Sequence, residues 1–416
     1  MLYPAKLTEE LQRQEAAFKA YSSHHVGQLA AWREALADLP RRYPSPAALR
    51  TALGHSGDEP HGALPTEDYA RASGPGLAIP FGRDFTSHEE ARTWAECLRG
   101  VTTLAVDGSQ LLPWRDASLP VALVQAGLYE NPHQPPAAYI KDVTTVVLTP
   151  AELSGMGESD MMDTRTGEVA AYSERVVHLR RFELEMATLV ARIERHAGNP
   201  DALAFFDGSL IVSFARKLPP AYRDRYLSAA RRLLDASARA RVPVVGYIDT
   251  TYARDIVTML RTLPPMPGHA PLPSAEGLYD ALLWGGQLGW GDRTAAFLAV
   301  RDEPGMSGTS QPKEDREPGE VAFVYFQAAL DRPPARLEIP RWVVDSGQLD
   351  RIVDLVRAEC VVGNGYPYPI EAADAVAVIS AHDRAQFYAI FQDFATRSGL
   401  PLTFSRKALS KSRRRV

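Results

Sequence analysis

Two stretches of this 416-residue sequence end in the same tripeptide: residues 101–109 read VTTLAVDGS and residues 202–209 read ALAFFDGS. Each begins with a short apolar run that is typical of a buried β-strand. Asp-Gly-Ser follows directly in both, and this tripeptide favours a turn. The sequence therefore predicts two strands that each deliver an aspartate, Asp107 and Asp207, to a strand end where a ligand can reach it.

The segments around these strands predict how they are connected. Apolar runs at 119–130 and 137–150, separated by prolines, indicate two more strands, and three consecutive strands favour an antiparallel meander. Residues 168–195 repeat apolar residues at three- and four-residue steps, which predicts a long helix. Strand and helix then alternate in four segments: 202–207, 223–240, 242–249 and 253–263. Such alternation is typical of parallel strands joined by crossover helices.

A meander, a helix and two strand-helix units follow one another in the element order of the ribonuclease H-like fold. We therefore predict an α/β protein with a mixed sheet, in which a three-strand antiparallel meander continues into parallel βα units. The helix predicted at 5–40 belongs to an N-terminal appendage, residues 1–100. The core domain spans 101–400, with a flexible loop at 302–319 and C-terminal additions after it, and residues 401–416 form a basic tail.

The composition narrows the class of protein. A 45% share of hydrophobic residues is ample for a packed core, and no run reaches the ~18 apolar residues of a membrane helix, so no membrane contact is expected. Two cysteines, Cys97 and Cys360, are too few for a disulfide framework or a four-cysteine zinc site, which favours the cytoplasm. The net charge of -5 leaves nucleic-acid contacts to local basic patches. The sequence has no Walker A, HExxH, GxSxG or paired CxxC motif.

The two strand aspartates form the first candidate site. If their strands are neighbours, Asp107 and Asp207 project toward one point, and paired carboxylates are the ligands that hard divalent ions such as Mg²⁺ or Mn²⁺ require. The alternative is that each aspartate only opens a turn, because Asp-Gly is a common turn dipeptide. Two copies at equivalent strand ends favour the metal site.

The long predicted helix carries a further acid. Glu183 lies in register with apolar residues such as Met186, and a buried carboxylate needs a metal or another cation as its partner. The neighbouring Arg180 and Arg181 offer an ordinary ion pair as the alternative. Glu185 faces another direction and is the weaker candidate.

Acids also lie in the first turn of a helix that is predicted after Pro369. Glu371 and Asp374 are candidate ligands, but both also satisfy the preference of a helix N-terminus for negative charge. His382 lies two turns further on. It is open to three interpretations: a metal ligand, a general acid or an ordinary, partly exposed histidine.

Basic and aromatic residues supply candidate contacts to DNA. Arg216 and Lys217 follow the second Asp-Gly-Ser, Arg293 lies in the turn GWGDRT, and Tyr366 lies in GYPYP. Phosphate binding uses cations in such positions. The alternative for the charged residues is a solvated surface, and the basic tail fits either interpretation.

The order of these motifs resembles that of the NurA family of nucleases. The resemblance spans residues 101–391 and rests on AVDGS, RRFELEMATL, FFDGSL, VVGYID, WGDRT and GYPYPIEAADAVAVIS. It implies a DNA nuclease with one or two Mn²⁺ ions, or Mg²⁺ in their place, that acts as a single-strand endonuclease and a 5'-to-3' exonuclease. It also implies a homodimer that works with a HerA-type hexameric ATPase on single-stranded DNA and duplex ends, in the repair of double-strand breaks.

Carried over residue by residue, the resemblance assigns metal binding and catalysis to Asp107, Glu183, Asp207 and Asp374. Relatives read Ala-His where this chain has Ala-Asp at Asp374, so a fourth carboxylate takes the place of a histidine ligand, with a greater preference for hard ions. Assigning that role to His382 would shift the match by eight residues and break the agreement of GYPYP and AVIS.

Three functions follow as alternatives. The first is in-line attack of water on a DNA phosphodiester, with the four acids holding one or two ions. The second is a non-catalytic adaptor that guides DNA to a motor ATPase, in which the acids only form turns. The third is an actin-like phosphotransferase, for which a second Gly-rich phosphate loop is not apparent in the sequence.

Overall fold

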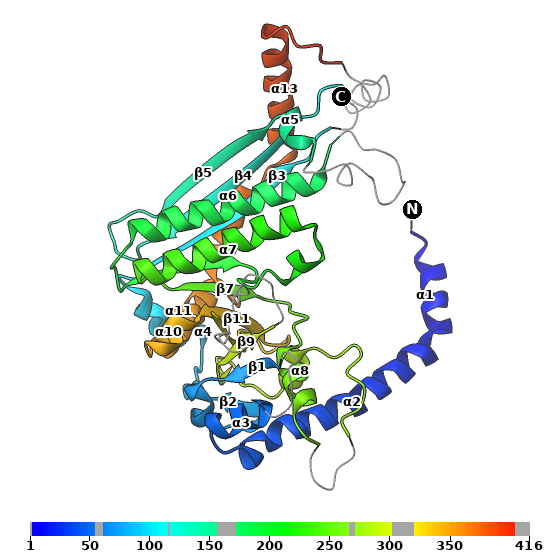
Figure 1. Ribbon diagram of the computed structural model, residues 1–416, viewed down its shortest axis with the longest axis vertical. Helices are drawn as coiled ribbons and strands as arrows, with labels where there is room; N and C mark the ends of the chain where they lie inside the picture. Colours follow the sequence, from blue (N-terminus) through cyan, green and yellow to red (C-terminus); the bar gives the residue numbers. More distant parts are fainter. Residues whose placement is uncertain are drawn as a thin grey trace. The chain divides into compact units, whose positions relative to one another are not determined.

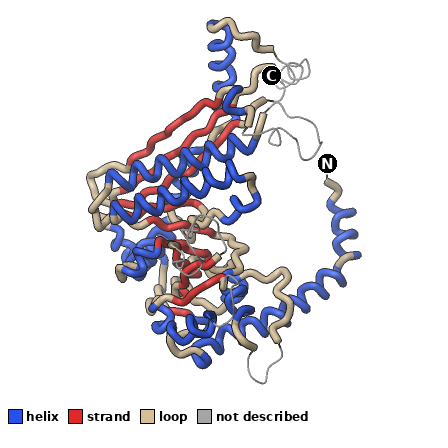
Figure 2. The backbone as a smooth tube through the Cα atoms, in the orientation of Figure 1, coloured by secondary structure: helices blue, strands red, loops and turns tan. Residues whose placement is uncertain are grey.

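The computed structural model describes residues 2–54, 61–114, 117–155, 172–265, 271–301 and 320–403. The chain folds as two compact units, whose elements are drawn in Figures 1 and 2. Unit 1 contains residues 1–84 and 248–341, and unit 2 contains residues 85–247 and 342–416. Within the part of the chain that the structure describes, no helix has the length and hydropathy needed to cross a membrane.

Unit 2 is built on a mixed sheet with the strand order β5-β4-β3-β6-β7. The strands are β3 (Thr102–Leu111), β4 (Ala122–Asn131), β5 (Ile140–Leu148), β6 (Ala202–Asp207) and β7 (Val244–Ile248). The first three pair antiparallel as a meander, whereas β6 runs parallel to β3 and β7 runs parallel to β6. The order and directions of the strands confirm the predicted ribonuclease H-like fold.

Helices cover both faces of this sheet. α6 (Glu174–Arg195) and α7 (Pro220–Ala240) lie side by side, as Figures 1 and 2 show, and α6 packs on β3 and β4. α12 (Tyr368–Ala377) packs on the same two strands from the other face. The remaining helices are α4 (His88–Trp94), η3 (Ala95–Leu98), α5 (Pro150–Leu153), η5 (Ser213–Lys217), α10 (Arg341–Asp345), α11 (Leu349–Val362) and α13 (Ala381–Arg397).

Unit 1 has an antiparallel sheet with the strand order β1-β9-β10-β11, to which β8 and β2 are added beside β10. Its strands are β1 (Gly62–Pro65), β2 (Ala78–Ile79), β8 (Arg293–Thr294), β9 (Phe297–Val300), β10 (Val321–Phe326) and β11 (Ala335–Pro340). Its helices are α1 (Pro4–Arg13), α2 (Glu15–Arg42), α3 (Pro46–Gly54), η1 (Glu67–Arg71), η2 (Pro75–Leu77), α8 (Asp255–Thr262) and α9 (Asp280–Trp284). The second half of α2 buries Trp32, Leu36 and Leu39 in this unit.

This division differs from the predicted domain boundaries. The prediction made residues 1–100 an appendage to a domain at 101–400, but residues 1–84 pack with 248–341 in unit 1. The cause is β1, which pairs with β9 from a distant part of the chain and so joins the N-terminal segment to a sheet. The predicted loop at 302–319 and the tail from residue 404 lie outside the described residues.

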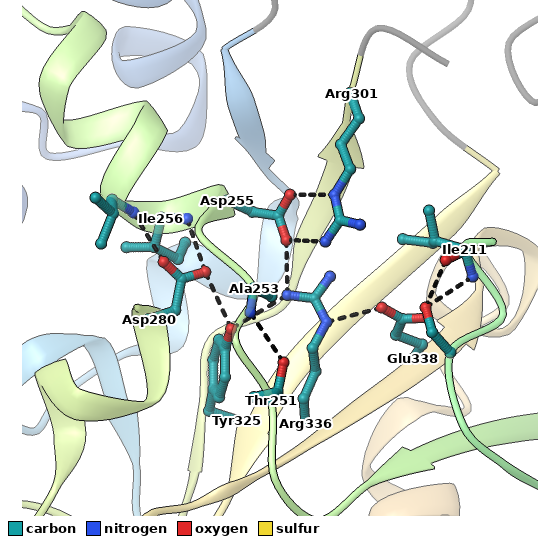
Figure 3. Close-up of polar contacts among 12 residues, drawn as sticks. Ile211, Thr251, Ala253, Asp255, Ile256, Asp280, Arg301, Tyr325, Arg336 and Glu338 are labelled. Carbon is teal, nitrogen blue, oxygen red and sulfur yellow. Dashed lines mark hydrogen bonds and ion pairs between the residues drawn. The ribbon is translucent and has the colours of Figure 1, made fainter. Parts of the chain in front are cut away.

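A buried network of charges lies in unit 1 among β11, the start of α8 and the end of β9 (Figure 3). The guanidinium of Arg336 is 1% exposed and lies 2.8 Å from carboxylate oxygens of both Asp255 and Glu338. Arg301 donates two further hydrogen bonds of 2.6 Å to Asp255. Asp280 accepts backbone N–H groups from the first turn of α8. The opposite charges and hydrogen bonds offset the cost of burying these groups.

Removing the central cation of this network should destabilise the protein. Arg336→Ala leaves Asp255 and Glu338 buried without that partner, and breaking a buried ion pair costs about 3–5 kcal/mol. We expect the free energy of unfolding in urea to fall by this amount. Arg332→Ala is the control, because its guanidinium is 47% exposed and 3.3 Å from Asp331, and it should cost less than about 1 kcal/mol. Equal losses in the two variants would contradict a stabilising role for the network.

Candidate functional site

Strands β3 and β6 of unit 2 bring two aspartates to neighbouring positions. The strands run parallel with Val106 opposite Phe206, so the residues that follow, Asp107 and Asp207, lie side by side. Asp207 is the last residue of β6. Asp107, in contrast, is not in the predicted turn, because β3 continues to Leu111 and pairs with β4 along this stretch. The same tripeptide therefore lies inside one strand and at the end of another.

Asp107 lies in a cluster of acids. Burial raises the pKa of its carboxyl group to about 6, against the effect of the Gly108 backbone N–H, which lowers it. The like charge of Asp207 raises the pKa further, as do a side-chain hydrogen bond and the like charge of Asp374. A carboxyl group keeps its proton at a pH above its usual pKa when no nearby cation favours the charged form. The cluster is therefore suited to bind a positive ion.

Helix α12 places Asp374 beside Asp107. The helix lies so close to β4 that a Cβ atom on Gly127 would meet the backbone nitrogen of Ala377 at 2.5 Å, so only glycine fits there. The side-chain amide of Gln125 donates to the Ala377 carbonyl at 2.7 Å and fixes the end of the helix. Asp374 is exposed, so this side of the cluster is open to solvent.

Glu185 joins the cluster from α6, on the opposite face of the sheet. Its Oε1 atom occupies the space that a side chain on Gly108 would need, since a Cβ there would lie 1.9 Å away. Burial raises the pKa of Glu185 to about 7, the charge of Arg181 lowers it, and the charges of Asp107 and Asp207 raise it again. The glycine of the first Asp-Gly-Ser thus makes room for a carboxylate.

Glu183, the predicted helical ligand, lies in other surroundings. Its Oε1 atom accepts a hydrogen bond of 2.7 Å from Arg225 of α7, and its Oε2 atom lies 3.2 Å from Arg180. The cause of the difference is the position of the buried stripe of α6, which includes Phe182, Glu185, Met186, Leu189 and Ile193. On this stripe Glu185 faces the sheet, and Glu183 lies at its edge in an ion pair. The structure therefore replaces Glu183 by Glu185 as the acid beside the two aspartates.

Asp207 is oriented by a tyrosine. The hydroxyl of Tyr366, a predicted DNA contact, donates to Oδ1 of Asp207 at 2.9 Å. The Tyr366 ring packs edge-on against Tyr247 of β7, with the ring centroids 5.0 Å apart. The hydroxyl of Ser209 donates to the Ile211 carbonyl at 2.7 Å and stabilises the loop after β6. Tyr366 thus has a contact with an acid of the cluster that the sequence did not indicate.

The other predicted residues are placed apart from this cluster or on the surface. Arg216 and Lys217 are exposed at the end of η5, and His382 is exposed in the first turn of α13. Arg293 is 2% exposed in unit 1, where it binds Asp68 at 2.5 Å through Nη1 and at 3.1 Å through Nη2. The prediction that Arg293 contacts DNA is therefore wrong, because its guanidinium is buried in an ion pair.

The acids of the cluster fit a hard divalent cation. Asp107, Glu185, Asp207 and Asp374 offer only carboxylate oxygens, which Mg²⁺ and Mn²⁺ prefer. Oε1 of Glu185 is buried and accepts no hydrogen bond, although the Nε of Arg181 lies 3.4 Å away. A metal ion would supply the closer contact that this oxygen lacks. Among the described residues, no three Asp, Glu, His or Cys side chains are arranged to hold an ion as they stand. Binding would therefore require these carboxylates to turn toward a common centre.

Comparisons with known proteins show which family the chain resembles. A family model described as the NurA domain matches residues 101–379, which is more than half of the chain. The chain is similar to the NurA nuclease from Sulfolobus solfataricus at 14% identity, over 72% of this chain and 85% of that one, with a TM-score of 0.44. It is similar to NurA with manganese at 10% identity, over 75% of this chain and 94% of that one, with a TM-score of 0.38. It is also similar to NurA bound to dAMP and manganese, at 11% identity over 68% of this chain and 85% of that one, with a TM-score of 0.29. No curated protein matches the chain.

Proposed function

This chain belongs to the NurA family, and on that premise we propose that it is a metal-dependent deoxyribonuclease. The proposal rests on one observation: four carboxyl groups from four elements of unit 2 lie close enough to interact electrostatically. They belong to Asp107, Glu185, Asp207 and Asp374. Like charges gathered in this way destabilise a fold unless a cation neutralises them. A divalent ion that also binds phosphate oxygens is the partner that such a cluster fits best.

The position of each acid suggests its part in the reaction. If these acids hold a divalent ion, it would supply Lewis-acid stabilisation of phosphate charge and would lower the pKa of a water molecule for in-line attack. Asp107 and Asp207 are central because they lie on adjacent strands. Glu185 contributes from the α6 face and Asp374 from the solvent side, while the Tyr366 hydroxyl holds one oxygen of Asp207 in place.

The finer activities that the family resemblance implies are part of the proposal. They are single-strand endonuclease and 5'-to-3' exonuclease activity with Mn²⁺ or Mg²⁺, a homodimeric state, and work with a HerA-type hexameric ATPase in the resection of broken DNA ends. Arg216 and Lys217 support phosphate contacts in unit 2, because both are exposed cations.

Cleavage of end-labelled DNA tests the proposed activity. Single-stranded and duplex DNA of one sequence are incubated with the full chain and Mn²⁺, Mg²⁺ or a chelator. We expect products with the metal ions and none with the chelator, and the label at either end gives the polarity. DNA binding without cleavage under all three conditions would overturn the proposal and support a non-catalytic adaptor. Thermal stabilisation by a nucleotide, again without cleavage, would support a phosphotransferase.

The raised pKa values predict how the effect of Mn²⁺ on stability depends on pH. In the metal-free protein, Asp107 (about 6) and Glu185 (about 7) bind protons more tightly in the folded state. They therefore stabilise the fold at low pH and lose this contribution as the pH rises from about 4 to about 7. Mn²⁺ must displace these protons, so it should raise the melting temperature more at about pH 7.5 than at about pH 5.5. A Mn²⁺ effect that is equal at both pH values would contradict binding at these acids.

A further inference from the structure

Arg181 is the cation of α6 that lies beside the acidic cluster, one helical turn before Glu185. Its Nη1 donates to the carbonyl of Gly108 at 3.1 Å, and its Nε lies 3.4 Å from Oε1 of Glu185. Gly108 is the residue after Asp107, so the guanidinium is fixed next to the backbone that carries a central acid. The charge of Arg181 acts on Glu185, because it lowers the pKa that burial raises.

The guanidinium still has donors to offer. Arginine has five N–H groups in a planar fork, a geometry that matches phosphate oxygens. Among the described residues, the one hydrogen-bond acceptor of Arg181 is the Gly108 carbonyl. Its Nε is buried 3.4 Å from Oε1 of Glu185, whereas the side chain as a whole is 35% exposed. A ligand at the cluster can therefore contact the N–H groups of Nη1 and Nη2 that the Gly108 carbonyl does not use.

The neighbouring arginines do not lie beside the acidic cluster as Arg181 does. Arg180 and Arg225 both bind Glu183, at the edge of the buried stripe of α6. A phosphodiester that approaches four carboxylates is repelled unless positive charge lies close by. Arg181 supplies such a charge on the α6 side of the cluster.

We propose that Arg181 is a further catalytic residue, whose guanidinium binds a non-bridging oxygen of the DNA phosphate that is cleaved. This inference rests on the proposed nuclease function. Arg181 contacts the phosphate while it remains bound to the Gly108 carbonyl, so that the same side chain fixes the substrate relative to Asp107. Its charge stabilises the negative charge that develops on the phosphate oxygens during in-line attack.

The competing explanation is that Arg181 only positions Glu185. The two roles differ in what they predict for the binding of DNA and of metal. A phosphate contact contributes to DNA affinity even without metal. Its loss reduces the slope of the logarithm of the single-strand binding constant against the logarithm of the salt concentration by about 0.7. A residue that only positions Glu185 would change Mn²⁺ affinity and leave this slope unchanged.

The experiment compares Arg181→Gln with Arg180→Gln in the full chain. Arg180 is the matched control, because it is the preceding residue of α6 and its side chain is 36% exposed. The readouts are the affinity of a labelled single-stranded oligonucleotide in chelator at several salt concentrations, Mn²⁺ affinity by calorimetry, and single-turnover cleavage with Mn²⁺.

For Arg181→Gln we expect single-strand affinity to fall severalfold with the smaller salt slope, Mn²⁺ affinity to change less than about threefold, and cleavage to fall about 100-fold. Arg181→Lys should recover part of the affinity, because lysine keeps the charge without the fork. Arg180→Gln should show none of these losses. An unchanged salt slope, or a loss of Mn²⁺ affinity as large as the loss of cleavage, would overturn the inference.

These outcomes also separate this inference from the proposed nuclease function. If Arg181→Gln cleaves like the wild type while Asp107→Asn is inactive, only the role of Arg181 fails. If the wild type itself does not cleave DNA, the proposed function fails, and the salt slope in chelator still reports whether Arg181 contacts phosphate.

Discussion

Asp107→Asn is expected to lower the rate of DNA cleavage at least about 1,000-fold, because stabilisation by a bound ion is worth several kcal/mol and each 1.4 kcal/mol changes a rate about tenfold. Asparagine keeps the size of the side chain and removes the charge of the residue that interacts with both Asp207 and Asp374. Single-turnover cleavage of labelled single-stranded DNA with Mn²⁺ measures the loss.

The same substitution should leave the fold intact. In the metal-free protein it removes repulsion from Asp207 and Asp374, so the melting temperature in chelator should equal or exceed that of the wild type. Asp224→Asn is the control, because this aspartate is 66% exposed on α7, and it should cleave like the wild type. Full activity in folded Asp107→Asn would remove this residue from the proposed site.

Glu185→Gln should lower cleavage about 100-fold, whereas Glu183→Gln should stay within about threefold of the wild type. Glu185 is buried over Gly108, interacts with both strand aspartates and lies 3.4 Å from Arg181 without a hydrogen bond to it, so an ion can still bind its carboxylate. The charge of Glu183 is already neutralised by Arg225 and Arg180. Cleavage by the two variants under identical conditions measures the difference.

Glu183→Gln should act on stability instead. Its carboxylate is 16% exposed and loses ion pairs with Arg225 and Arg180, so the free energy of unfolding should fall by about 1 kcal/mol. The two glutamates are separated by one residue on the same helix, so each controls for the other. An inactive Glu183→Gln beside an active Glu185→Gln would show that the ion binds at Glu183, and the structural assignment would be reversed.

The sheet of unit 2 could be predicted because its elements carry strong periodic patterns. The strand predicted at 202–207 is β6, and the alternation after it predicted the parallel pairing of β6 with β7. The sequence left open whether β6 also lies beside β3, the pairing that sets Asp207 beside Asp107. Unit 1 could not be predicted in the same way. Its strands β1, β2, β8 and β9 have two to four residues each, which is too short for an alternating pattern. They depend on pairing with distant segments.

The candidate site could be predicted in part. The two aspartates were evident from their repeated tripeptide, but the choice between Glu183 and Glu185 depends on which side of α6 meets the sheet. Side chains two positions apart on a helix point to different faces, so only one of the two glutamates can face the sheet. The local sequence does not distinguish them, because apolar residues flank both. Gly108 lies inside β3, where a glycine often marks a close approach, but this signal was hidden because the sequence predicted a turn at Gly108. Here the approaching group is the carboxylate of Glu185.

Arg293 shows a second limit of the sequence. Its place in a Gly-rich turn suggested an exposed cation, but its partner Asp68 lies 225 positions away in the chain. An ion pair across such a separation has no local pattern, and only the packed structure reveals that the guanidinium is buried. Asp374 is the opposite case, because its place on α12 could be read from the segment that contains it.

Anomalous diffraction from a crystal of the full chain soaked in Mn²⁺ tests the central claim most directly. We predict a peak about 2.0–2.6 Å from carboxylate oxygens of Asp107 and Asp207, with Glu185 or Asp374 completing the set of protein ligands. A Mn²⁺ peak coordinated by Glu183, or no peak at the acids of unit 2, would contradict it.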